Sequence, residues 1–251
     1  MAKAVTKKPG AARKPAAKPR KPPAKAAHNH VRFFIKWFLR LGMAVAVLLI
    51  LAVLGYAIFN PPTTPYILAE ARRLDGVDRQ WVSIEEVAPV MARSVVAGED
   101  ANFCNHWGFD MAEIRAALED GSGRGASTLS QQVVKNVYLW QGRSWIRKAL
   151  EAVMTPLVET IWTKRRIIEV YLNVAEFGPG IFGVEAASRT YFRIGPDKLS
   201  ATQAARLAAV LPNPKKRSVK NPSQFVRTRT RAITDGAATI LADGRAACFE
   251  S

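Results

Sequence analysis

The sequence predicts a mainly α-helical domain that follows a single transmembrane helix. After residue 80, apolar residues recur at the three- and four-residue spacing of helices, and we find no alternating strand and no internal repeat. Before it, Leu41–Phe59 is a run of 19 residues without a charge. As a helix, this run extends about 28 Å, which is enough to cross the hydrocarbon core of a bilayer.

The positive charge of the chain is concentrated before the apolar run. The 251 residues carry a formal charge of +17, and residues 1–40 hold 12 of the 37 Lys and Arg but none of the 20 Asp and Glu. Residues 1–30 are mostly Ala, Lys, Pro and Arg, which cannot bury apolar surface, so we predict disorder there. Such a tail can be a nucleic-acid arm, but its place before an apolar helix favours a tail that sets membrane orientation. We therefore predict no nucleic-acid partner.

We divide the chain into a disordered basic cytoplasmic tail (1–30), a transmembrane signal-anchor (31–60), a connector (61–80) and a helical catalytic domain (81–251). The Lys and Arg bias places the N-terminus in the cytoplasm and the domain outside. A buried core helix and a cleaved signal peptide are the alternatives for the apolar run. The run is long for a signal peptide, and Asn60-Pro61-Pro62 stands in place of a small-residue cleavage site.

Caps and spacing predict the helices of the domain. Ser83 and Glu86 form a capping box before an apolar pattern that reaches Glu99. The further helices are predicted, in chain order, at residues 110–118, 128–140, 144–162, 164–173, 184–192, 201–211 and 225–241. Glycines mark a flexible loop at 121–125 and a turn at 178–183.

The cysteines and histidines predict little by themselves. Cys104 and Cys248 are the only two cysteines. An oxidising compartment permits a disulfide, but we interpret Cys104 as a small packed residue and do not predict a bridge. His106 is the only histidine after residue 30, and no metal-ligand spacing appears.

Three segments bring carboxylates, amides and cations into one 53-residue stretch, at residues 99–108, 125–136 and 147–151. Glu99 falls where a helix ends, and it can act as a general base if Phe103 and Trp107 shield it from water. Taken alone, a solvated acidic residue at a helix end is the simpler interpretation.

The other two segments suit an anionic leaving group. Ser127 lies at a predicted helix N-terminus, where backbone N–H groups bind anions, and Gln132 shares a helix face with Lys135. Taken alone, these residues form an ordinary cap, and Lys148 with Glu151 an ordinary surface pair. Four cations together suit a pyrophosphate, whose developing charge needs fixed positive partners: Lys135, Arg143, Arg147 and Lys148.

Together, the segments resemble the peptidoglycan glycosyltransferases, glycosyltransferase family 51. Glu-Asp-x-x-Phe-x-x-His-x-Gly runs from Glu99, Gly-x-Ser-Thr-x-x-Gln-Gln-x-x-Lys-Asn from Gly125, and Arg-Lys-x-x-Glu from Arg147. A fourth segment, residues 169–187, is also similar. The resemblance covers about residues 80–215 and implies a lysozyme-like helical fold.

The resemblance implies that the chain polymerises lipid II into β-1,4 glycan strands and releases undecaprenyl pyrophosphate. Its partners are then lipid II, the nascent strand and the bacterial inner membrane. Whether it also binds other cell-wall synthesis or division proteins is left open. No Ser-x-x-Lys with a later Lys-Thr-Gly occurs, so we expect no transpeptidase activity.

The family also implies roles for single residues. Glu99 takes the proton of the acceptor 4-hydroxyl, and Glu151 orients the acceptor or helps to hold a divalent cation, Mg²⁺ or Mn²⁺. Ser127 and Gln132 line the donor sugar site. The substrate-binding set is completed by the four cations named above, Lys135, Arg143, Arg147 and Lys148, and by Asn136. His106 and Asn173 are expected to be structural.

A murein-cleaving, lysozyme-like enzyme is the alternative function. It acts on finished glycan and has no need of a pyrophosphate site, so the cations argue against it. A non-enzymatic scaffold leaves the motifs unexplained. We further hypothesise that the apolar residues between Gly108 and Gly125 insert into the membrane interface. The alternative is that they form an inward-packed helix face. These residues are Phe109, Met111, Ile114, Ala116, Ala117 and Leu118.

Overall fold

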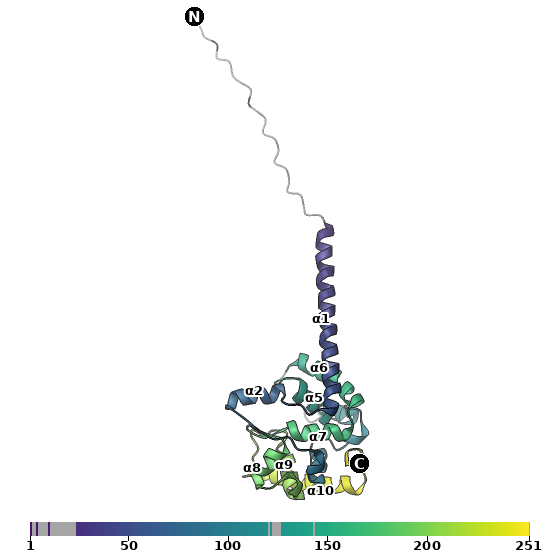
Figure 1. The fold of residues 1–251 in the computed structure, drawn as a ribbon, viewed down its shortest axis with the longest axis vertical. Helices are drawn as coiled ribbons and strands as arrows, with labels where there is room; N and C mark the ends of the chain where they lie inside the picture. The colour runs from purple at the N-terminus through teal and green to yellow at the C-terminus, as the bar shows by residue number, and fades with distance from the viewer. Residues whose placement is uncertain are drawn as a thin grey trace. The chain divides into compact units, whose positions relative to one another are not determined.

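The computed structural model describes residues 1, 4, 10, 24–119, 121, 127–142 and 144–250 (Figure 1). The chain divides into two units, residues 1–48 and 49–251. Most of the basic tail and the glycines at 123 and 125 lie outside the described residues. The expected disorder and loop mobility therefore stay predictions.

A single long helix, α1 (Ala24–Ile58), contains the apolar run. Within its segment His30–Ile58, the most apolar window of 18 residues has a mean hydropathy of 2.6 and is almost wholly exposed. A core helix would be covered by neighbours, so the exposed apolar surface is consistent with a membrane anchor. The helix begins earlier than the uncharged run, because the preceding aromatic residues continue it.

The second unit begins with the last turns of α1, which are fixed to the domain. Trp162 donates its indole N–H to the carbonyl oxygen of Val53 at 2.8 Å. Arg166 donates to the carbonyl oxygens of Tyr56 and Phe59, at 3.1 and 2.8 Å. The carbonyl of Tyr56 belongs to the last turn of α1, where no further helical turn supplies a donor, so Arg166 acts there as a partner.

The remaining described elements confirm a mainly helical domain. The α-helices are α2 (Pro65–Leu74), α3 (Pro89–Glu99), α4 (Met111–Glu119), α5 (Leu129–Tyr138), α6 (Trp145–Ile161), α7 (Lys164–Val174), α8 (Val184–Phe192), α9 (Ala201–Val210), α10 (Gln224–Ala242) and α11 (Ala247–Glu250). The short 3₁₀ turns are Ile84–Glu86, Phe103–Asn105 and Pro196–Lys198.

Two helical groups build the core. In one, α3, α9 and α10 pack on one another; in the other, α5 packs on α6 and α7. In the view of Figure 1, α7 lies between α5 above it and α9 and α10 below it. Ile167, Ile168 and Leu172 of α7 are fully buried. Burying side chains of this size contributes about 1.5–3 kcal/mol each, so α7 is a central element of the core.

Local capping explains most helix starts. The side chains of Thr128, Ser144, Thr163 and Ser200 each accept a hydrogen bond from a backbone N–H in the first turn of the following helix. The capping box at Ser83 is also present, but it caps only a 3₁₀ turn. The continuous helix predicted from Ser83 to Glu99 was therefore wrong: Pro89 disfavours a helical residue before it, so α3 begins at the proline.

A small sheet and a helix were not predicted. β1 (Asp78–Arg79), β2 (Glu176–Gly178) and β3 (Ile181–Phe182) pair in the order β1-β3-β2. β1 is parallel to β3, and β2 is antiparallel to it. β1 and α2 both lie in the segment expected as a connector, so that segment carries ordered structure. Strands of two or three residues are too short to show alternation.

Cys104 is packed against the core, as interpreted, but a disulfide that we did not predict is also present. Cys104 forms a disulfide with Cys248 of α11, 144 residues later. Phe103 and Phe249 lie beside it with ring centroids 6.4 Å apart, and Arg245 donates to the carbonyl oxygen of Ala101 at 2.9 Å. The C-terminal turn is therefore fastened to the loop that follows Glu99.

Removing this disulfide is expected to destabilise the domain. A cross-link that closes a loop of this length restricts the unfolded chain by an amount worth about 5 kcal/mol in the chain-entropy model, and measured losses are about 2–5 kcal/mol. The double variant Cys104→Ser, Cys248→Ser should therefore melt at a lower temperature than the oxidised protein. Reductant should lower the wild-type melting temperature and leave that of the variant unchanged. Equal melting temperatures of variant and oxidised wild type would contradict the prediction.

Candidate active site

Glu99 is the last residue of α3, and its side chain is 8% exposed. Gln132 of α5 donates from Nε2 to Glu99 Oε2 at 3.0 Å. The other end of the Gln132 amide accepts a hydrogen bond from the Tyr171 hydroxyl at 3.2 Å. Tyr171 of α7 thus orients the Gln132 amide, and the amide in turn orients Oε2 of Glu99.

Burial raises the pKa of the Glu99 carboxyl above its ordinary value. The Gln132 hydrogen bond and the charges of Arg229, Arg217 and Lys135 oppose the rise. A carboxyl with a raised pKa is a stronger base once it is ionised. A buried carboxylate of this kind can serve as a general base, and this role of Glu99 stays a prediction.

Asp100 is a structural residue. Its Oδ2 accepts the backbone N–H of Leu129 at 2.9 Å, which ties the loop to the N-terminus of α5. Its Oδ1 lies 2.8 Å from His106 Nε2. Because His106 Nδ1 accepts the N–H of Gly108, Nε2 is the protonated nitrogen and donates to Asp100. Both nitrogens of His106 are therefore used inside the protein.

Gly108 lets this loop pass close to α6. Its φ is +84°, and a Cβ there would lie 2.4 Å from Cγ2 of Thr155. Thr128 donates from its hydroxyl to the carbonyl oxygen of Gly108 at 2.7 Å.

Asn173, at the end of α7, exchanges two 2.9 Å hydrogen bonds with the backbone of Val82.

The cations gather around Glu151, which is buried in α6. Arg147 donates to Glu151 Oε2 at 2.6 Å, and Lys148 pairs with Oε1. Lys135 reaches the same place from α5. A cavity of about 120 Å³ is lined by Ser127, Gln131, Gln132, Lys135, Arg147, Lys148 and Glu151. Burial lowers the pKa of the Lys135 ammonium group.

Glu151 does not fit a protein-held metal. Both of its oxygens are engaged by Arg147 and Lys148, whose charges oppose that of a cation. Within the described part of the chain, no three His, Cys, Asp or Glu side chains are grouped as metal ligands. The expectation of a divalent cation near Glu151 thus finds no ligand set in these residues.

Three cavities follow one another along α5. The first, about 220 Å³, includes Glu99 and shares Ser127 with the cation cavity. The third, about 170 Å³, shares Gln132 and Lys135 with it and adds Asn136. The structure thus places all the predicted site residues that it describes along one cleft. Arg143 lies outside the described residues.

Three residues near Glu99 were not predicted. Tyr171 belongs to the fourth segment, where a buried Tyr beside Leu172 resembles ordinary core. Arg217 and Arg229 follow Glu99 by more than a hundred residues, and their surroundings resemble a solvated basic stretch. Only the fold brings them to this carboxylate.

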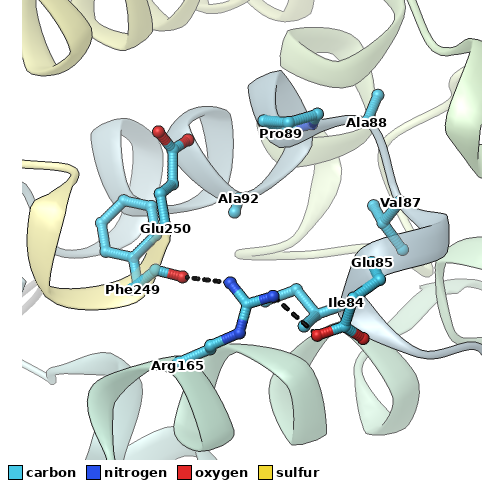
Figure 2. Close-up of a pocket in the computed structure, with 9 residues that line it drawn as sticks. All are labelled: Ile84, Glu85, Val87, Ala88, Pro89, Ala92, Arg165, Phe249 and Glu250. Atoms are coloured by element: carbon cyan, nitrogen blue, oxygen red, sulfur yellow. Dashed lines mark hydrogen bonds and ion pairs between the residues drawn. The ribbon is translucent and has the colours of Figure 1, made fainter.

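A separate pocket of about 250 Å³ is lined by residues of α3, α7 and α11 (Figure 2). Arg165 lies at its centre and donates to Glu85 and to the carbonyl oxygen of Phe249. None of the predicted site residues lines this pocket.

Comparison with known proteins agrees with the site. Residues 67–238 match the family model Transglycosylase. A biosynthetic peptidoglycan transglycosylase of Jannaschia sp. is 55% identical over 214 residues, which are 85% of this chain and 90% of that protein. Proteins of the same name from Pseudomonas aeruginosa and Caulobacter vibrioides are 48% and 44% identical, over 80% and 79% of this chain and 88% and 89% of their own lengths. The chain therefore belongs to the transglycosylase family.

Proposed function

We propose that this protein polymerises lipid II into β-1,4-linked glycan strands and releases undecaprenyl pyrophosphate. One observation carries the proposal: a buried carboxylate, Glu99, lines a cavity that shares Ser127 with a second cavity, which is lined by Lys135, Arg147 and Lys148. This is the arrangement that an inverting transfer from a lipid pyrophosphate requires. Family membership supports the same reaction.

In this reaction Glu99 takes the proton of the acceptor 4-hydroxyl. The hydroxyl oxygen attacks the anomeric carbon of the donor as the bond to the pyrophosphate oxygen breaks. The new bond is β because attack comes from the face opposite the α-linked leaving group. The hydrogen bond from Gln132 holds the carboxylate in place, so the base is oriented before the substrate arrives.

The leaving pyrophosphate is stabilised by Lys135, Arg147 and Lys148, with Arg143 expected to join them. Glu151 holds Arg147 and Lys148 toward the cavity and offsets their mutual repulsion. In a site shielded from water these charges act more strongly than they would in solvent. Ser127 lines both the Glu99 cavity and the cation cavity, and Gln132 lines the cation cavity and the third cavity, to which Asn136 also belongs. Ser127 and Gln132 are proposed to contact the donor sugar.

Purified full-length protein with lipid II tests the proposed function. We expect glycan polymer from lipid II and no release of fragments from isolated sacculi. Degraded sacculi without polymer would instead identify a murein-cleaving enzyme.

The location proposed is the bacterial inner membrane, with the tail of residues 1–30 in the cytoplasm and the catalytic domain outside. The exposed apolar helix α1 and the Lys and Arg bias before it support this orientation. Reversing the charges of Lys and Arg in residues 1–40 should therefore misplace the domain. Protease added outside spheroplasts should digest the wild-type domain and spare that of the variant; equal digestion would refute the orientation.

The segment after Gly108 is proposed to contact the membrane interface. No residue of α4 is buried, although Ile114 and Ala117 are half-buried, and this supports membrane contact over the alternative of an inward-packed face. Met111 and Leu118 are 55% and 75% exposed, and Trp107, four residues before Met111 in the chain, is 73% exposed. Large exposed apolar side chains close together mark a contact surface. A substrate held in a bilayer by its lipid tail makes that bilayer the natural partner.

Replacing Met111 and Leu118 with Ser is expected to lower activity on long-chain lipid II about tenfold, because two large apolar contacts are lost. Activity on a short-chain, soluble analogue should change little. Leu241→Ser, at an exposed position of α10, is the control and should leave both activities unchanged. Equal losses on the two substrates would argue against membrane contact.

A further inference from the structure

Two arginines from outside the motif segments converge on Glu99. Arg229 of α10 donates from Nη2 to the carbonyl oxygen of Gly98 at 2.7 Å. The same nitrogen lies 3.6 Å from Glu99 Oε1. Arg217, after α9, donates to the carbonyl oxygen of Ala209 at 3.0 Å and lies over the Phe225 ring. Arg229 is therefore held beside the carboxylate by the backbone of α3.

The two oxygens of Glu99 differ in their surroundings. Oε2 accepts from Gln132. Oε1 is buried and has no hydrogen-bond partner among the described residues, and Nε of Arg229 is in the same condition. A buried polar atom without a partner is uncommon and indicates a position that a ligand or water completes. Oε1 is thus the carboxylate oxygen whose lone pairs no described protein group uses.

The separation between Arg229 and Oε1 matters for a base. A close, bidentate Arg–carboxylate pair would occupy the lone pairs of Oε1 and weaken it as a proton acceptor. At 3.6 Å the guanidinium still favours the ionised carboxylate by its charge, while its hydrogen bond goes to Gly98. The arrangement offsets burial and keeps Oε1 free.

We propose that Arg229 is a positioning residue for the base: it fixes the end of α3 through Gly98 and supplies the charge that keeps Glu99 ionised with Oε1 open to the acceptor hydroxyl. This inference rests on the proposed function. It assigns to α10 a part in the reaction that none of the motif segments indicates.

Other charged and titratable groups face Glu99 from the elements around it. Lys135 lies on α5, Tyr171 on α7 and Arg217 after α9, while Asp100 is engaged by His106 and Leu129. Asp110 and Glu113 line the same cavity. Among the cations, Arg229 does most to lower the pKa of Glu99, followed by Arg217 and Lys135. Burial works in the opposite direction and exceeds them together.

The pH dependence of kcat/KM on lipid II tests the proposal with the full-length protein. In Arg229→Gln, loss of the adjacent charge should move the acidic midpoint upward by roughly one pH unit. The rate should recover at higher pH, where Glu99 ionises without help. Arg229→Lys keeps the charge, so its midpoint should stay near that of the wild type. Arg231→Gln, at an exposed position of the same helix, is the matched control and should change neither midpoint nor rate.

Each outcome decides one question. A rate that falls equally at every pH, with the midpoint unchanged in Arg229→Gln, would make Arg229 merely structural and overturn the proposal. If Arg229→Gln does not fold, Arg217→Gln replaces it and should raise the midpoint by a smaller amount; an unchanged midpoint there, or a raised one in Arg229→Lys, would overturn the proposal equally. Failure of the wild type to polymerise lipid II would instead remove the proposed function.

Discussion

Glu99→Gln is expected to lower the rate of lipid II polymerisation by about 10²–10⁴-fold, the usual contribution of a general base. The amide keeps the size of the side chain but cannot take the acceptor proton. Polymerisation of lipid II by the purified variant measures the effect. Glu85→Gln changes an exposed carboxylate that pairs with Arg165 away from the cleft, and it should retain full activity.

The same variant should not lose stability at neutral pH. The pKa of Glu99 is raised in the folded protein, so the folded state binds this proton more tightly than the unfolded chain does. Stability therefore falls as pH rises from the ordinary glutamate pKa through the folded one, and it stays lowered above. A neutral Gln removes that cost. An inactive variant with an unchanged or higher melting temperature confirms a role in the reaction, whereas near wild-type turnover would exclude Glu99 as the base.

Glu151→Gln is expected to lower polymerisation by about 10²–10³-fold, similar to the loss of one group that stabilises a developing negative charge. Without this carboxylate, Arg147 and Lys148 repel one another and lose their common anchor. The lost charged hydrogen bonds should also cost about 1.5–3 kcal/mol of unfolding free energy.

A matched variant separates the two effects of Glu151. Glu185→Gln removes another buried carboxylate that pairs with an arginine four residues later, Arg189, away from the cleft. It should lose a similar amount of stability and none of the activity. If Glu151→Gln behaves in the same way, then its ion pairs are only structural.

The helices were predicted where local chemistry determines them. Ser200 marks the start of α9, and residues 184–192 were predicted within the bounds that α8 has, because caps and glycine turns act over a few residues. The two-residue strands have no such local pattern. The disulfide depends on the approach of residues 144 apart, and no local pattern contains that information.

The candidate site shows the same division. Glu99, Gln132 and Glu151 stand in segments whose spacing suggests chemistry, and the fold brings them to one cleft. Arg229 carries no such spacing. Arg229 lies beside the Glu99 carboxylate, 130 positions earlier in the chain, because α10 packs on α3.

The fastening of the Glu99 loop to residues 245–250 sets the order of events during synthesis. Cys248 is made 144 residues after Cys104, which at about 5–20 residues per second is roughly 7–30 s later. Until then the loop lacks its covalent tie, and α3 lacks α10, against which it packs. An unfinished chain can hold its substrate-facing helices α5 and α6 and still have no properly placed base. We therefore expect a chain that still lacks residues 224–250 to have no polymerisation activity.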